Sequence, residues 1–178
     1  GPEPKVIIYQ FVKRMGIFAC NAHAVFSERA TWLVPGDLRT TAIGQIKSTT
    51  NAWLLNVHVF MRAWRKVKAS GRYLKCDWTI KVDPDTVWFP HRLRPMLRSY
   101  SNPDDYIYFA NCNQTTWHHW SMQGPIEILS RGAVWKYTHG SDACLTQIDL
   151  GFAGEDIFAD RCLKLLGARK ELGHGLLS

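Results

Sequence analysis

Apolar side chains recur at steps of three and four residues in the first half of the chain. They are Trp53, Val57, Phe60, Trp64 and Val67. This spacing places them on one face, so it predicts a long amphipathic helix whose tryptophans lie in the core. Ser48, Thr49 and Thr50 are candidate N-caps, and Gly71 is a typical residue for the end of such a helix.

An apolar run with high β-propensity follows this helix. Trp78, Ile80 and Val82 lie in it and predict a buried strand. The run ends in Asp83-Pro84-Asp85. Because Pro84 fixes its own φ and biases Asp83 towards an extended conformation, we expect a stiff turn at the end of this strand.

The remaining pattern alternates between short strands and helices. Residues 3–15 fit a strand in part, but the pairs Ile7/Phe11 and Ile8/Val12 favour a helix. Further elements are expected as follows: a short buried strand at 16–20, a short apolar piece at 24–27, a loop at 32–44, a helical turn at 91–100, strands at 106–110 and 124–130, a loop at 115–123, and a helix at 131–137 followed by a polar loop with Cys144.

The last predicted helix begins at Gly154-Glu155-Asp156 and ends near Gly167. Its expected apolar face consists of Phe158, Cys162, Leu165 and Leu166. Taken together, the alternation predicts a three-layer α/β domain with a mixed central sheet, and we expect residues 1–178 to form one such domain.

Composition narrows the class of protein. The chain has 178 residues, of which 46% are hydrophobic and 21% charged, as in a folded globular protein. No apolar run reaches the length of a membrane span, so we expect any membrane anchor to lie outside this chain.

The net charge of +7 suits anionic partners. No recognition motif for nucleic acid accompanies it, and the basic residues at 62–72 are expected to form a solvated helix face.

The cysteines and one tripeptide give weaker signals. Five cysteines are too few for a disulfide scaffold, and their spacing contains no C-x-x-C pair, which argues against a zinc site. Asn113-Gln114-Thr115 is an acceptor triplet for N-glycosylation, which favours a secretory route only slightly.

Two pairs of acidic residues are the candidate site residues. Asp83 and Asp85 repel each other at the end of a buried strand, and a divalent cation relieves that repulsion. The alternative is a solvated turn, since Asp and Pro are ordinary turn residues. Glu155 and Asp156 lie at a helix N-terminus, where the dipole stabilises carboxylates; they either cap the helix or point into a site at the sheet edge.

In this order the motifs resemble GT-A glycosyltransferases, and most closely the fringe and core-1 β1,3-galactosyltransferase type. The resemblance covers roughly residues 47 to 168. The matching segments are the strand into Asp83-Pro84-Asp85-Thr86, the segment from Gly124 to Ala133, and Cys144 followed by the stretch from Gly154 to Leu163. It implies a GT-A-like, Rossmann-like domain and a metal-dependent inverting transfer of a sugar from a UDP-sugar to a hydroxyl of a glycan or glycoprotein.

The resemblance also implies residue roles. Asp85, supported by Asp83, binds Mn²⁺ or Mg²⁺ on the donor diphosphate, and Asp83 and Lys81 contact the nucleotide sugar. Asp156 is the base for the acceptor hydroxyl, with Glu155 as the alternate, because an alcohol is a poor nucleophile until its proton is removed. Cys144 and Cys162 form a disulfide, and the protein is placed in the secretory pathway, in the Golgi lumen.

Two features depart from the family pattern. The family has a nucleotide-contacting N-terminal strand, and none is placed here if residues 3–15 are helical. The family's late histidine metal ligand has one candidate, His174, in an unfamiliar context. Both departures suggest a domain trimmed at both ends, with the activity of the trimmed chain in question.

Two other functions remain open on the sequence. A haloacid-dehalogenase-type phosphatase would use Asp83 as nucleophile, Asp85 as general acid, and Asp156 and Asp160 as magnesium ligands. That family carries its motif on the first strand, whereas some 80 residues precede it here. A transferase-like module that binds a nucleotide or glycan without turnover is the non-enzymatic alternative.

Overall fold

The computed structural model describes residues 3–45, 52–114, 119–149, 151 and 154–176. The chain divides into two compact units, each described here by itself. We call Gly1–Gln45 with Val82–Ser101 the N-terminal unit, and Ile46–Lys81 with Asn102–Ser178 the sheet unit. The structure is a mixed α/β protein with a mixed sheet, as the sequence predicts at this level.

A four-stranded sheet, with the strand order β10-β6-β9-β5, organises the sheet unit. The strands are β5 (Trp78–Val82), β6 (Ile107–Ala110), β9 (Ile126–Ser130) and β10 (Arg169–Leu172). β6 runs parallel to β10 and antiparallel to β9, so the sheet is mixed. Every residue of β6 and β9 is buried, as expected for the interior strands of a covered sheet. A separate antiparallel ribbon pairs β7 (Cys112–Gln114) with β8 (His119–Ser121).

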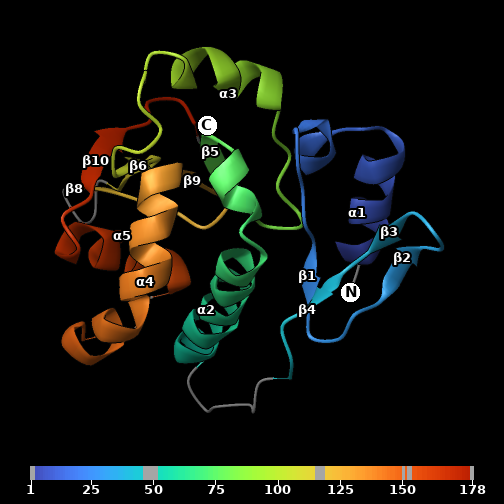
Figure 1. Cartoon of the computed structure of the whole chain (residues 1–178), viewed down its shortest axis with the longest axis horizontal. Helices are drawn as coiled ribbons and strands as arrows, with labels where there is room; N and C mark the ends of the chain where they lie inside the picture. Colours follow the sequence, from blue (N-terminus) through green and yellow to red (C-terminus); the bar gives the residue numbers. More distant parts are fainter. Residues whose placement is uncertain (1–2, 46–51, 115–118, 150, 152–153, 177–178) are drawn as a thin grey trace. The chain divides into compact units, whose positions relative to one another are not determined.

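Three long helices supply most of the core of the sheet unit. They are α2 (Ala52–Ser70), α4 (Arg131–Gln147) and α5 (Glu155–Leu165), and a short 3₁₀ helix, η2 (Arg72–Lys75), follows α2. Figure 1 shows α4 and α5 side by side, and these two helices are in contact. Val57, Met61 and Trp64 of α2 are buried in one cluster with Tyr137 of α4 and Phe158 of α5.

The N-terminal unit is built from short elements. Its helices are α1 (Glu3–Val12), the 3₁₀ helix η1 (Gly16–Ala19) and α3 (Pro90–Leu97). Its strands are β1 (Phe26–Ser27) parallel to β4 (Thr41–Ala42), and β2 (Trp32–Val34) antiparallel to β3 (Leu38–Arg39). Thr40 is buried between these strands, and its Oγ1 accepts a hydrogen bond from the Thr31 backbone N–H at 2.9 Å.

Several predicted elements are confirmed. The amphipathic helix is α2, and Gly71 directly after it has a φ of 63°, a left-handed conformation that glycine adopts without strain. Its proposed N-caps at 48–50 lie outside the described residues, as does the side chain of Trp53. The helix at 3–15, the strands at 78–82, 106–110 and 124–130, and the helices beginning at 91, 131 and 154 correspond to α1, β5, β6, β9, α3, α4 and α5.

Other predictions are wrong. The segment 16–20 is a 3₁₀ helix instead of a strand, and Gly16 has a φ of 55°, which a strand does not use. The segment 32–44 contains three short strands instead of one loop, and the stretch 115–123 contains β8. Strand β5 is only half-buried along its length, although full burial is expected from its apolar residues.

The C-terminal third also holds corrections. Cys144 lies inside α4, because that helix extends ten residues beyond the predicted end at Tyr137, to Gln147. Leu165 is 50% exposed and does not belong to the apolar face of α5. The strand β10 has no counterpart among the predicted elements. No described helix has the length and apolar character needed to cross a membrane.

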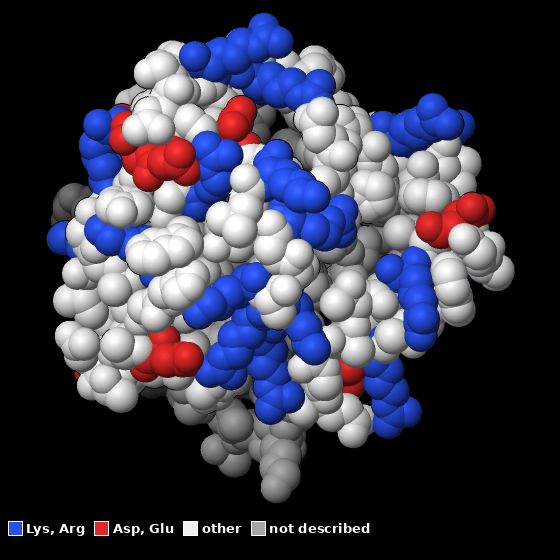
Figure 2. Space-filling model, viewed as in Figure 1, with Lys and Arg blue, Asp and Glu red and all other residues white. Residues whose placement is uncertain are grey.

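The basic residues of α2 lie where the charge pattern predicts. Arg65, Lys66 and Lys68 are exposed. Figure 2 shows blue side chains gathered over this part of the sheet unit. Because these side chains are exposed, solvent stabilises their charges, and Arg65 is also paired with Asp142 of α4.

Candidate functional site

Asp83, Pro84 and Asp85 directly follow the last residue of β5 and form a turn. The Thr86 backbone N–H donates a hydrogen bond to the Asp83 carbonyl oxygen at 3.0 Å, which closes the turn. Asp83 is half-buried and Asp85 is exposed. The stiff Asp-Pro-Asp turn is therefore present, with one carboxylate partly withdrawn from water and the other open to it.

The start of α5 holds the second acidic pair. Gly154 is the N-cap, and Glu155 and Asp156 occupy the first helical positions. The two side chains have different surroundings: Glu155 is buried, whereas Asp156 is partly exposed. The helix dipole favours negative charge at both positions.

Asp156 is held by backbone N–H groups. Its Oδ2 accepts a hydrogen bond from the Gly124 N–H at 3.0 Å, and its Oδ1 accepts one from the Ile157 N–H at 2.8 Å. Each carboxylate oxygen has a second lone pair, so the group can still accept a proton from a bound hydroxyl. The arrangement fixes the orientation of a partly exposed carboxylate, as a general base requires.

Lys81 ties three elements of the sheet unit together. Its Nζ donates to Glu155 Oε1 at 2.6 Å and to the Gly124 carbonyl oxygen at 2.9 Å, and it lies 3.1 Å from Glu127 Oε1. It also lies 4.2 Å from the centroid of the Phe60 ring. The predicted role of Lys81 in donor binding stays a prediction, while its ammonium already links β5, β9 and the start of α5.

Glu127 is the site residue that the sequence analysis missed. It is the second residue of β9 and its side chain is 0% exposed. Charged residues are almost never fully buried unless they are paired. A lone glutamate in the apolar run Ile126 to Leu129 is a signal that could have drawn attention to this position.

Burial raises the pKa of both glutamates. For Glu155, burial is the largest cause, and the negative charge of Glu127 is the next. For Glu127, burial again dominates, while the positive charge of Lys81 opposes it. Tyr137 of α4 is also affected: burial, followed by the charges of Glu127 and Glu155, raises its pKa well above the usual range.

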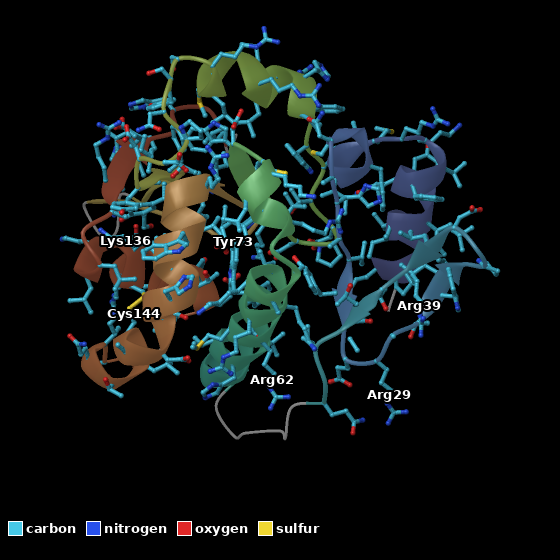
Figure 3. All side chains as sticks on the ribbon, viewed as in Figure 1. Arg29, Arg39, Arg62, Tyr73, Lys136 and Cys144 are labelled. Atoms are coloured by element: carbon cyan, nitrogen blue, oxygen red, sulfur yellow. A yellow bond between two sulfur atoms is a disulfide. The ribbon has the colours of Figure 1, made fainter. Side chains whose placement is uncertain are left out.

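A disulfide connects α4 to α5 within the sheet unit. It joins Cys144 to Cys162, the pair that the family resemblance implies, and both cysteines are buried. Figure 3 shows the sulfur–sulfur bond beside the label of Cys144. Because α5 carries Glu155 and Asp156, the bond restrains the helix on which the second acidic pair lies.

The expected metal ligands come from both units of the chain. His174 is exposed after β10, and its ring meets the Trp120 ring edge-on at a centroid distance of 4.6 Å. In the part of the chain that the structure describes, no group of three or more His, Cys, Asp or Glu side chains is arranged to hold a metal ion. Asp83 and Asp85 belong to the N-terminal unit, and Asp156 and His174 to the sheet unit.

Asp160, a magnesium ligand in the phosphatase alternative, has a lysine partner. The Lys170 Nζ lies 2.9 Å from each of its carboxylate oxygens, and Asp160 is 6% exposed. This ion pair connects α5 to β10. Asp160 is therefore occupied by a structural contact within the sheet unit.

Comparison with known proteins does not assign the chain to a family. No protein-family model matches the chain, and no curated protein matches it.

Proposed function

We propose that the chain is a metal-dependent inverting glycosyltransferase with a GT-A-like fold, which moves a sugar from a UDP-sugar to a hydroxyl of a glycan or glycoprotein. The mixed sheet and the Cys144–Cys162 disulfide agree with what the resemblance implies. A disulfide also suits an oxidising compartment, which supports placement in the secretory pathway.

The observation that carries the proposal is the position of strand β5. Its Lys81 side chain contacts the start of α5, where Asp156 lies, and two residues later the chain enters Asp83-Pro84-Asp85. Strand β5 therefore contacts the start of α5 within the sheet unit and leads along the chain into the candidate metal-binding turn.

The donor set fits a hard divalent cation. Asp83 and Asp85 offer carboxylate oxygens, and cations such as Mg²⁺ are commonly held by one or two carboxylates together with substrate phosphates. When bound, Mn²⁺ or Mg²⁺ would offset negative charge on the departing nucleoside diphosphate. A third protein ligand is not required, so His174 is dispensable in this proposal.

Asp156 supplies the acid–base step. As the acceptor oxygen forms its bond to the anomeric carbon, the bond from that carbon to the diphosphate oxygen breaks. The hydroxyl proton passes to the Asp156 carboxylate. A single displacement of this kind inverts the configuration at the anomeric carbon.

The proposal is tested by calorimetry with UDP in the presence and absence of Mn²⁺, followed by a screen of UDP-sugars for transfer. We expect Mn²⁺-dependent UDP binding that weakens at least tenfold, about 1.4 kcal/mol, in Asp85→Ala. Asp37→Ala is the matched control, because Asp37 is an exposed turn aspartate of the same unit, and it should bind as the unaltered chain does.

The possible outcomes separate the alternatives. UDP binding that ignores both Mn²⁺ and Asp85 contradicts the proposed metal site. Metal-dependent binding with no transfer from any UDP-sugar replaces the enzyme with a nucleotide-binding module. A beryllofluoride adduct on Asp83 replaces the transferase with the phosphatase.

A further inference from the structure

The carboxylate oxygens of Glu127 lack hydrogen-bond donors in the described part of the chain. The carboxylate is fully buried, and neither of its oxygens receives a hydrogen bond with regular geometry in the described part of the chain. Its Oε1 has the ion-pair contact with Lys81, whereas Oε2 has no partner there. A buried acceptor without a donor is costly, so Glu127 needs one further hydrogen-bond donor.

The charges of the cluster are also unbalanced. Lys81 offers one positive charge, while Glu127 and Glu155 offer two negative charges when both are ionised. Their side chains are only 12%, 0% and 10% exposed, respectively, so a net negative charge would be poorly solvated. One bound proton corrects both imbalances, because it removes the excess charge and supplies the missing donor.

The carboxyl groups are placed so that they can share that proton. Lys81 Nζ lies 3.1 Å from Glu127 Oε1 and 2.6 Å from Glu155 Oε1, so both carboxyl groups meet at one ammonium. Two close carboxylates in a buried site titrate as a pair and retain one proton well into the range where a solvated carboxyl is ionised. The same reasoning explains carboxyl pairs in which one member acts as acid and the other as conjugate base.

We propose that Glu127 and Glu155 share one proton at neutral pH, and that the neutral cluster they form with Lys81 positions Asp156 through the backbone of Gly124. The last link is direct: the Gly124 carbonyl oxygen accepts from Lys81, and the Gly124 N–H donates to Asp156. Glu127 is thus a positioning residue. The catalytic meaning of that position rests on the proposed role of Asp156 as base, whereas the shared proton does not.

The neighbouring elements determine what else can titrate here. From α5 the cluster faces Asp156, whose negative charge also raises the pKa of Glu127. From α4 it faces Tyr137, and from α2 the Phe60 ring. Tyr137 remains neutral because burial and both glutamates disfavour its ionisation. The carboxyl pair is therefore the group that changes charge as the pH rises above neutrality.

Isotope-edited infrared spectroscopy of the full chain with labelled glutamate tests the shared proton. At pH 7 we expect one protonated glutamate per chain, which disappears in Glu127→Gln and equally in Glu155→Gln. Either substitution leaves one carboxylate for one ammonium, so no proton is needed. Glu28→Gln is the control, because Glu28 is exposed, and it should keep the signal.

The positioning step is tested by the nuclear magnetic resonance signal of the Gly124 amide. In the unaltered chain this signal should shift above neutral pH as the shared proton leaves and Lys81 faces two carboxylates. In Glu127→Gln the shift should vanish, although the amide keeps its neutral-pH position, since glutamine resembles the protonated acid.

Three results would overturn the inference. They are no protonated glutamate at pH 7 in the unaltered chain, a protonated glutamate that persists in either variant, or a Gly124 titration that is unchanged in Glu127→Gln. If a variant does not fold, the count of protons per unaltered chain still decides. None of these measurements uses sugar transfer, so failure of the proposed function leaves the shared proton intact, and the converse also holds.

Discussion

Gly124 and Asp156 are joined by a hydrogen bond of 3.0 Å from the glycine N–H to the aspartate Oδ2. The same glycine accepts from Lys81 through its carbonyl oxygen. A backbone segment far from α5 in sequence therefore holds the side chain of its second residue. Such an anchored and partly exposed carboxylate is better suited to proton transfer than a freely rotating one, because its orientation is fixed before a substrate arrives.

Asp156→Asn should abolish most sugar transfer while leaving the fold intact. The amide oxygen can still accept from the Gly124 N–H, although the Ile157 N–H then loses its acceptor, and the side chain no longer takes up a proton. Loss of a general base typically lowers the rate by about 10²- to 10⁴-fold. The measurement is a transfer assay at saturating donor, with UDP binding by calorimetry as the control. A variant that transfers normally would exclude Asp156 as the base.

The free energy of unfolding should fall as the pH rises above about 4.5. Burial and Glu127 raise the pKa of Glu155 from 4.5 to about 10, so the folded chain holds a proton that the unfolded chain releases in that range. The stabilisation is complete below the unfolded pKa and is lost as the pH rises through the folded one, by at most about 1.4 kcal/mol per pH unit for one proton. Urea unfolding at a series of pH values measures the slope. In Glu155→Gln the slope should flatten, and a slope identical to that of the unaltered chain would contradict the assignment.

Replacing the linked cysteines by serine should destabilise the sheet unit. Cys144 and Cys162 close a loop with a sequence separation of 18, for which the chain-entropy argument gives about 3 kcal/mol. The double variant Cys144→Ser/Cys162→Ser is compared with Cys76→Ser, because Cys76 is not in a disulfide. Chemical denaturation monitored by circular dichroism gives both values. Equal stabilities of the two variants would show that the link contributes little.

Lys170→Met should cost about 3–5 kcal/mol, because it leaves the buried Asp160 carboxylate without its cation. Arg65→Met is the matched control, since Arg65 and Asp142 form an exposed ion pair, with side-chain exposures of 56% and 71%. Exposed pairs contribute about 0–1 kcal/mol. The comparison uses urea unfolding at one pH. A similar small effect for both lysine and arginine replacements would mean that Asp160 is solvated once Lys170 is removed.

Sequence pattern predicted the regular elements where local signals agree. The apolar spacing of α2 and the glycine after it identify that helix and its end at Ser70. Strand β10 was missed because Arg169, Lys170 and Glu171 are charged. Its strand conformation comes from parallel pairing with β6, a partner that is distant in sequence. Pairing of that kind leaves no periodic trace in the strand itself.

The extent of α4 shows how packing can override composition. Thr138, Gly140 and Ser141 suggest a loop, yet they lie within the helix. A Cβ at position 140 would lie only 2.5 Å from Leu166 Cδ2, so the glycine permits the close approach of this side chain. Gly140 is therefore explained by its contact with Leu166, which follows the end of α5. The local sequence around Gly140 carries no sign of this contact.

The candidate site was predicted in part. Asp83, Asp85, Glu155 and Asp156 were identified from carboxylate spacing and helix position. Glu127 was not, because its importance depends on Lys81 and Glu155, which reach it from other elements. The role of a buried charge depends on the groups that contact it.

The covalent link between α4 and α5 affects how the protein should be prepared. A host with a reducing cytosol would deliver α5 without this tie, and the thiols of Cys144 and Cys162 could then pair wrongly with Cys76 or Cys112 on exposure to air. Material for every assay above should come from an oxidising secretory host and be checked by mass spectrometry for the correct pairing. If protein made without the Cys144–Cys162 disulfide is inactive, the missing bond is a sufficient cause. That result does not test the role of Asp156.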